Sequence, residues 1–122
     1  MGNSDYKISI QSNYVLVERS QDYEVTLKEQ PAMLRKLSSV CKEADCRNAL
    51  ILGPGTKVAL STFDILDLGR RIAKLGLRIA IVESHDASNE DVNFLENAVW
   101  NRGGYIRFFE REMEAKYWLR NS

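Results

Sequence analysis

The sequence predicts a single α/β domain over residues 1–122: a mixed, mostly parallel sheet of four to five strands with about four helices. Three observations predict this fold class. A chain of 122 residues can bury one hydrophobic core and is too short for two. Its apolar content of 44% and charged content of 28% are those of a globular protein. After residue 25, segments of helical periodicity alternate with short apolar runs, as they do where helices connect parallel strands.

Two short strands are expected at the start of the chain. Ile8 and Ile10, and then Val15 and Val17, alternate with polar residues on either side of a polar turn at 11–13. This period-two alternation around a turn predicts an antiparallel pair. We expect the first of the two strands to lie at an edge of the sheet.

A helix is expected next. Thr26 and Glu29 have the spacing of a capping box. Pro31 is unfavourable so far inside the first turn, and it moves the expected start of the helix to about its own position. One face of this helix should be buried, because apolar residues recur at helical spacing, at Leu34, Leu37, Cys41 and Ala44.

Strands and helices then alternate to the end of the chain. A continuous apolar run at 49–52 predicts a strand covered on both faces, another buried strand is expected at 77–82, and a last strand is expected at 105–109. Three more helices are expected. The first is capped by Ser61 and Asp64 and stopped by Gly76, the second covers about 88–100 and the third covers 112–119. Their expected inward residues are, in this order, Ile65, Leu68, Ile72 and Leu75; Val92, Leu95 and Val99; and Ala115, Trp118 and Leu119.

Charge and apolar pattern exclude several classes of partner. Lys and Arg total 17, as do Asp and Glu, and no basic stripe is visible, which argues against nucleic acids and anionic membranes. The apolar runs are too short to span a bilayer. No secretory signal is visible, so we expect a cytoplasmic protein in which Cys41 and Cys46 are reduced thiols.

Several segments occur in an order that is found in a known family. They are Cys41-Lys42-Glu43-Ala44 at the end of a helix, Arg47-Asn48-Ala49-Leu50-Ile51-Leu52, Leu77-Arg78-Ile79-Ala80-Ile81-Val82, Asn101-Arg102-Gly103-Gly104 before Ile106-Arg107-Phe108-Phe109, and Glu114-Ala115 followed by Trp118-Leu119. From about Lys7 to Leu119 the chain resembles the STAS-like domains, the fold of anti-sigma-factor antagonists, and in particular their SpoIIAA-like branch of small stand-alone bacterial proteins. The resemblance implies a small α/β domain that acts by binding a partner.

The resemblance also raises the question of a phosphorylation switch. Family members on the anti-sigma side exchange partners under control of a phosphorylated Ser that directly follows an Asp at the start of a helix. Neither Asp64 nor Asp67 is followed by a Ser here, so no acceptor is carried over. Ser61 and Thr62 remain candidate regulatory phosphosites, because a helix N-terminus favours negative charge. The alternative is that Ser61 serves only as an N-cap.

A glycine-containing segment follows the strand at 49–52. Gly53, Gly55, Thr56 and Lys57 form a candidate ligand loop, because ligands of α/β proteins bind at the carboxyl ends of parallel strands. The spacing is not that of a P-loop, and a plain turn is the alternative.

No catalytic residues, metal ligands or cofactor are predicted. His85 is the only histidine, and no spacing in the sequence implies that it meets a nucleophile. One His and two scattered cysteines do not provide the four paired ligands of a structural zinc site.

Two aromatic residues are candidates for an interface. Trp100 and Tyr117 fall outside the inward faces of their helices, and exposed aromatic side chains are enriched at protein interfaces. We therefore expect a non-enzymatic regulatory or scaffolding module that binds another protein, or a second copy of itself in a homodimer. The alternative is a carrier or sensor of a small apolar ligand, a lipid or a nucleotide. An enzyme is the third interpretation, and it would require His85 beside a nucleophile in a pocket.

Overall fold

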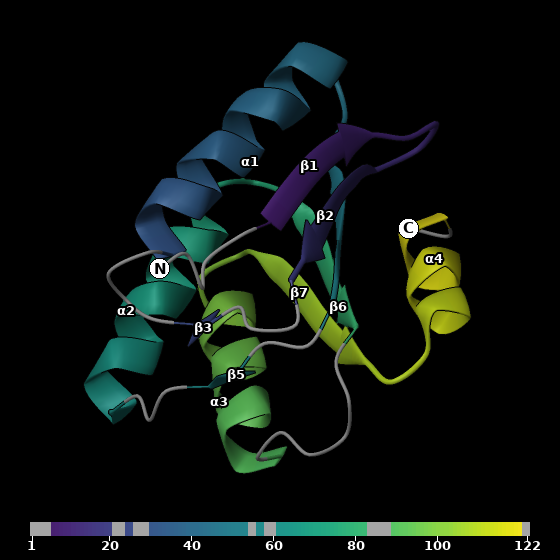
Figure 1. Cartoon of the computed structure of the whole chain (residues 1–122). Helices are drawn as coiled ribbons and strands as arrows, with labels where there is room; N and C mark the ends of the chain where they lie inside the picture. Colours follow the sequence, from purple (N-terminus) through teal and green to yellow (C-terminus); the bar gives the residue numbers. More distant parts are fainter. Residues whose placement is uncertain are drawn as a thin grey trace.

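The computed structural model describes residues 6–20, 24–25, 30–53, 56–57, 61–82 and 89–120. These residues form a five-stranded mixed sheet and four helices, so the predicted fold class is confirmed (Figure 1). Within these ranges no helix is both long and apolar enough to cross a membrane. In chain order the elements are β1 (Tyr6–Ile10), β2 (Val15–Arg19), β3 (Glu24–Val25), α1 (Gln30–Ala44), β4 (Asn48–Leu52), β5 (Thr56–Lys57), α2 (Thr62–Ala73), β6 (Arg78–Val82), α3 (Asn89–Trp100), β7 (Tyr105–Phe109) and α4 (Glu112–Arg120).

The main sheet has the strand order β1-β2-β4-β6-β7. Strand β1 pairs with β2 in the antiparallel direction, which confirms the expected antiparallel strand at the edge. The pairs β2–β4, β4–β6 and β6–β7 are parallel. A second, two-stranded sheet joins β3 to β5, and no pattern in the sequence predicted it.

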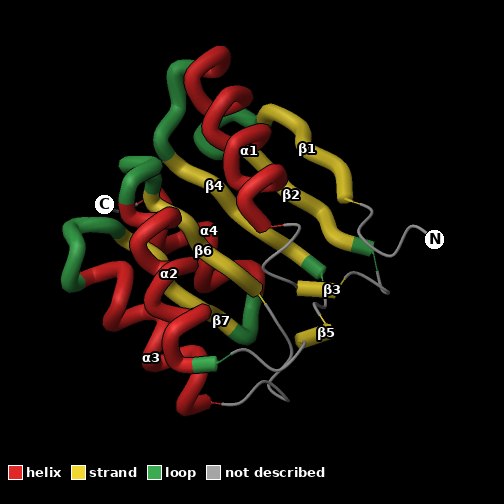
Figure 2. The backbone as a smooth tube through the Cα atoms, turned by 90° about the vertical axis from the view of Figure 1, so that its left-hand side faces the viewer, coloured by secondary structure: helices red, strands yellow, loops and turns green. Residues whose placement is uncertain are grey.

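The strand order explains how the helices are distributed. Each parallel crossover steps to the next strand in the same direction, and right-handed crossovers that all step one way put their helices on one face. Helices α1, α2 and α3 therefore cover one face of the sheet (Figure 2). Helix α4 follows the last strand and lies on the opposite face, where it contacts β4, β6 and β7 (Figure 1).

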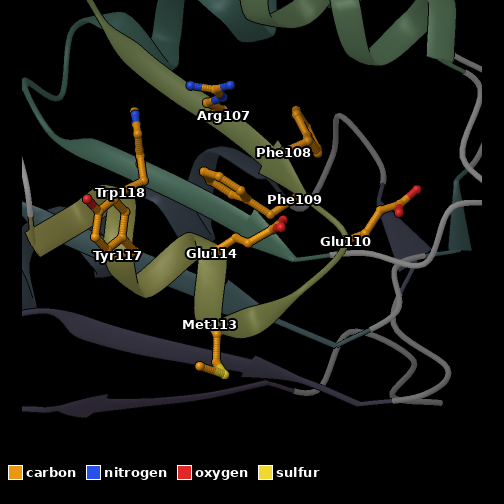
Figure 3. A pocket seen from close by; sticks show the side chains of 8 residues that line it. All are labelled: Arg107, Phe108, Phe109, Glu110, Met113, Glu114, Tyr117 and Trp118. Carbon is orange, nitrogen blue, oxygen red and sulfur yellow. The ribbon is translucent and has the colours of Figure 1, made fainter.

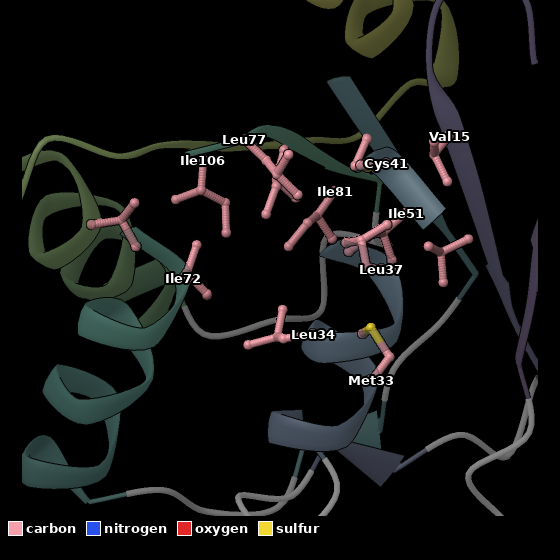
Figure 4. Packing of buried hydrophobic residues seen from close by; sticks show 14 of the residues in the cluster. Val15, Met33, Leu34, Leu37, Cys41, Ile51, Ile72, Leu77, Ile81 and Ile106 are labelled. Carbon is pink, nitrogen blue, oxygen red and sulfur yellow. The ribbon is translucent and has the colours of Figure 1, made fainter. Parts of the chain in front are cut away.

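The main core lies between the sheet and the three crossover helices (Figure 4). Helices α2 and α3 approach closely where Gly69 faces Ala98, since a Cβ added to Gly69 would lie 2.8 Å from the Ala98 Cβ. The buried residues of this core are Val15, Val17, Met33, Leu34, Leu37, Cys41, Ala49, Ile51, Leu68, Ile72, Leu77, Ile79, Ile81, Val99 and Ile106.

The helices begin close to the expected positions. Helix α1 begins at Gln30, which places Pro31 in its first turn, where a missing N–H is tolerated. The proposed capping box of Thr26 and Glu29 lies outside the described residues. The inward residues expected of all four helices are buried or partly buried, except Val92, whose side chain lies outside the described part of the chain.

A smaller apolar cluster lies between the sheet and α4. Its buried members are Leu50, Ala80, Ala115 and Leu119. Partly buried side chains surround them, namely Tyr14, Leu16, Leu52, Val82, Phe109 and Trp118. In the part of the chain that the structure describes, one helix of nine residues thus covers this face of a five-stranded sheet, and several apolar side chains around it keep contact with solvent.

Candidate functional site

A groove of about 820 Å³ runs between strand β7 and helix α4 (Figure 3). Strand β7 is the last strand of the sheet, and its alternate residues Arg107 and Phe109 line the groove from one side. The exposed face of α4 lines it from the other. We call this hollow the β7–α4 groove, and its lining residues are Arg107, Phe108, Phe109, Glu110, Met113, Glu114, Tyr117 and Trp118.

The side chains that α4 contributes to the groove are unusually exposed for apolar residues. Met113 is 83% exposed and Tyr117 is 61% exposed. The two residues are four positions apart and so share one face of the helix. Tyr117 and Trp118 project from α4 near Phe109 of β7, and the Phe109 and Trp118 rings meet at 5.8 Å between centroids (Figure 3). The groove therefore combines an aromatic floor with two accessible apolar side chains.

Arg78, the first residue of β6, holds α4 against the sheet. Its Nη2 atom donates a hydrogen bond of 2.9 Å to the backbone oxygen of Trp118. The same guanidinium group lies 4.1 Å from the centre of the Trp118 ring, close enough for a cation–π interaction. Both contacts fix Trp118, and with it the floor of the groove.

The rim of the β7–α4 groove carries both signs of charge. The Arg107 guanidinium lies 5.7 Å from the centre of the Phe109 ring. Glu110 and Glu114 are exposed, and neither forms an ion pair with another described residue. Next to them Lys116 pairs with Glu112 at 2.8 Å, and the hydrogen bond that its ammonium group donates to this carboxylate raises the pKa of Lys116. Two carboxylates of the rim thus remain available to a basic group.

Side chains from α3 occupy part of the outer edge of β7. The Trp100 Nε1 atom donates to the backbone oxygen of Ile106 at 3.2 Å, and the backbone N–H of Phe108 donates to the Glu96 carboxylate at 2.9 Å. Ile106 and Phe108 are two residues apart, so their backbone groups point to the same side of the strand. Because both partners come from α3, that side is the one away from β6. The two side chains therefore occupy backbone groups that would otherwise pair with a further strand.

The two predicted interface residues do not lie together. Trp100 is 49% exposed, and its ring meets Tyr105 edge-on at 5.1 Å. Tyr117 is exposed as well, but α3 and α4 lie on opposite faces of the sheet (Figure 1). Tyr117 lines the β7–α4 groove, whereas Trp100 occupies the edge of β7.

The candidate phosphosites lie at the start of α2. Ser61 is its N-cap: the Oγ atom accepts from the Asp64 N–H at 3.1 Å, and the Asp64 carboxylate accepts from the Ser61 N–H at 3.3 Å. The expected capping box is confirmed. The Ser61 and Thr62 side chains are both exposed, which leaves their modification a prediction.

The candidate ligand loop lies at the carboxyl end of the sheet. Gly53 directly follows β4, and its backbone oxygen accepts a hydrogen bond of 2.7 Å from Nη2 of Arg19, at the end of β2. Thr56 and Lys57 form β5, and Gly55 lies outside the described residues. Arg19 is only 9% exposed, so a buried cation lies beside Gly53.

Sequence reasoning missed most of the β7–α4 groove. Arg107, Phe109 and Met113 were assigned to no site, and Arg78 was treated as part of a buried strand. One signal was present: Met113 and Tyr117 are large apolar residues four positions apart on the outer face of a helix. The involvement of β7 carried no such signal, because it depends on the order of strands in the sheet.

Among the described residues no three His, Cys, Asp or Glu side chains lie close enough together to hold a metal ion, and His85 lies outside the described residues. No model of a known protein family matches the sequence, and no curated protein matches it.

Proposed function

We propose that the chain is a non-enzymatic cytoplasmic module that binds a protein partner in the β7–α4 groove. One observation carries the proposal: the groove exposes the large apolar side chains of Met113 and Tyr117, at 83% and 61%. Apolar residues that are exposed together and surrounded by polar ones are typical of interaction sites. Removing such a surface from water on binding is favourable, by about 25 cal/mol per Å² of apolar area.

The charges around the groove define the chemistry of the partner. Glu110 and Glu114 are the carboxylates of the rim that lack an ion pair with other described residues. A partner segment with an apolar side chain beside a Lys or Arg would fill the aromatic floor and place its cation next to these carboxylates. We therefore propose a partner segment of that composition.

The geometry of β7 supports docking on α4 rather than extension of the sheet. A peptide that added to the sheet would need the outer backbone groups of β7, and two of these are bonded to Trp100 and Glu96. The β7–α4 groove lies on the face of the sheet that α4 covers, and a segment bound there needs no hydrogen bonds to the backbone of β7. Binding through side chains in the groove leaves both α3 contacts in place.

The proposed STAS-like assignment agrees with this function. The resemblance of residues 7–119 implies a domain that acts by binding, and the sheet with its antiparallel first strand is compatible with it. A fold by itself decides no function. The proposal therefore rests on the groove, and the resemblance adds only the expectation of a regulatory role.

A selection from random peptides displayed on phage tests the proposal directly. The full chain is immobilised, and the selected peptides are made and measured by fluorescence anisotropy. We expect enrichment of peptides that pair an apolar residue with Lys or Arg. Tyr117→Ala should weaken their binding at least tenfold, since aromatic residues at the centre of an interface contribute about 2 kcal/mol or more. Glu114→Lys should weaken them as well, by charge repulsion.

Phe63→Ala is the matched control, because Phe63 is 78% exposed but belongs to α2, on the other face of the sheet. Its peptide affinities should equal those of the unchanged chain. The proposal is wrong if no peptide is enriched, or if the groove variants bind the selected peptides normally. A ligand of small-molecule mass that co-purifies with the chain and is lost in Tyr117→Ala would replace it with the carrier function.

A further inference from the structure

Helix α1 ends in a backbone motif that brings two cysteines together. Asp45 follows the helix with a φ of +54°, and its N–H donates to the Lys42 oxygen at 3.2 Å. The N–H of Cys46 donates to the Cys41 oxygen at 3.0 Å. These two bonds and the left-handed residue define a Schellman motif. In this motif the side chains of the two residues joined by the bond that spans more of the chain, here Cys41 and Cys46, are neighbours. Here both of those side chains are cysteines.

The hydrogen bond limits the distance between the two cysteines. The path from the Cys41 Cα through its carbonyl and across the 3.0 Å bond to the Cys46 Cα is, with standard bond lengths, roughly 7 Å when straight. The two Cα atoms must therefore be closer than that. A disulfide requires about 4.4–6.8 Å between Cα atoms, and this upper limit brings the two backbone positions into the neighbourhood of that range.

The two thiols differ in their surroundings. Cys41 is 2% exposed and belongs to the main core (Figure 4). Cys46 is partly exposed and packs against the same core, with its Sγ atom 3.5 Å from the Asn13 oxygen and 3.6 Å from the Asn48 oxygen. Burial, and then the neighbouring Cys46, raise the pKa of Cys41 to about 11. Because Cys41 is buried and Cys46 is partly exposed, Cys46 is the thiol that an oxidant in solution can reach.

We propose that the end of α1 is a thiol oxidation site, at which Cys41 and Cys46 form a reversible intramolecular disulfide in response to a peroxide. The Cys46 thiolate attacks one peroxide oxygen, the O–O bond breaks, and the released hydroxide takes up a proton as water. This leaves a sulfenic acid on Cys46. The Cys41 sulfur then attacks the Cys46 sulfur, the S–O bond breaks, and a second water leaves with the Cys41 proton. Two thiols lose two electrons in total, and the peroxide gains them.

The cross-link is compatible with the folded state. It spans only the final turn of α1 and the two residues after it, which the backbone bonds already hold together. Oxidation moves the Cys46 Sγ away from the Asn13 and Asn48 carbonyl groups. The Asn48 amide keeps its own hydrogen bonds to the oxygens of Asn13 and Leu119. The disulfide therefore marks the oxidised protein without requiring it to unfold.

The sequence offers a direct test, because trypsin cuts after Lys42, between the two cysteines. The reduced full chain is treated with hydrogen peroxide, and its remaining thiols are blocked before digestion. We expect an intact mass lower by about 2 Da, from the loss of two hydrogens on disulfide formation. We also expect tryptic peptides 37–42 and 43–47 to stay linked until dithiothreitol separates them.

Two variants separate the steps. Cys41→Ala should accumulate the sulfenic acid on Cys46, which dimedone traps as a stable adduct, and Cys46→Ser should give no linked peptides. Since the peptide linkage is measured on the unchanged chain, the test does not depend on the folding of either variant. The proposal is overturned if peroxide leaves both thiols intact, if it only adds oxygen to Cys46, or if it yields covalent dimers instead of the internal link.

Discussion

Gly53 leaves strand β4 with a φ of +103°, beside the backbone of Arg19. A Cβ at this position would lie 2.5 Å from the Arg19 oxygen, so Gly53→Ala combines backbone strain with a steric clash. Gly76→Ala is the matched control, since Gly76 has a φ of +68° but no atom within 4 Å of an added Cβ. We expect Gly53→Ala to lower the free energy of unfolding by about 1–3 kcal/mol more than the control does. Equal losses in urea unfolding would show that the clash is relieved.

The buried thiol of Cys41 predicts a pH dependence of stability. Its pKa is raised from 9.0 to about 11, mainly by burial. Between these values the unfolded chain has given up a proton that the folded chain still holds, so the free energy of unfolding decreases as pH rises through this window. Cys41→Ala removes this contribution. The stability difference between the unchanged chain and the variant, measured by urea unfolding, should therefore shrink between pH 9 and pH 11. A constant difference would contradict the prediction.

Helix α3 has a second role, as a cover for the edge of β7. Glu96 and Trp100 are one turn apart, and their side chains bond to Phe108 and Ile106. The double variant Glu96→Ala, Trp100→Phe exposes both backbone groups, and exposed strand edges pair with other chains. We expect self-association that increases with concentration in sedimentation velocity. Asn97→Ala, an exposed change on the same helix, should sediment like the unchanged chain. If the double variant does too, the edge is protected by other means.

The elements predicted best are those whose residues carry a local signal. Strands β4 and β6 lie within a residue of their expected bounds, because burial on both faces favours consecutive apolar residues, as at 49–52 and 79–82. The capping box of α2 is also a local signal, because its two residues are only three positions apart in the sequence. Strands β3 and β5 have two residues each, too few to show any periodicity.

The β7–α4 groove could not be predicted, because its parts meet only in the folded chain. Arg78 and the Trp118 oxygen are 40 residues apart in sequence and 2.9 Å apart in space. Trp100 and Tyr117 looked equivalent as exposed aromatic residues. The strand order separates them, because it puts α3 and α4 on opposite faces of the sheet. Exposure was predictable from helical periodicity, whereas membership of a common surface was not.

The unequal covering of the two faces has a consequence for the stability of the fold. Among the described residues, three helices cover one face and only the nine residues of α4 cover the other, so α4 should open to solvent more readily than the rest. Arg78→Ala removes the hydrogen bond to Trp118 and the stacking on its ring. We expect the amides of α4 to exchange with deuterium about tenfold faster, the effect of losing ~1–2 kcal/mol, with the amides of β4 and β6 unchanged.

Two further variants decide whether the planar guanidinium group is what holds α4. Arg78→Lys keeps the charge but lacks the flat surface that stacks on Trp118, so it should restore little of the protection against exchange. Arg107→Ala should leave α4 almost unaffected, because Arg107 lies over Phe109 in the same sheet strand and its side chain has no hydrogen bond to α4 in the described residues. Full protection in Arg78→Ala would mean that the apolar contacts of Ala115 and Leu119, together with the Asn48 hydrogen bond to the Leu119 oxygen, hold α4. The groove would then owe its shape to packing rather than to the cation at its floor.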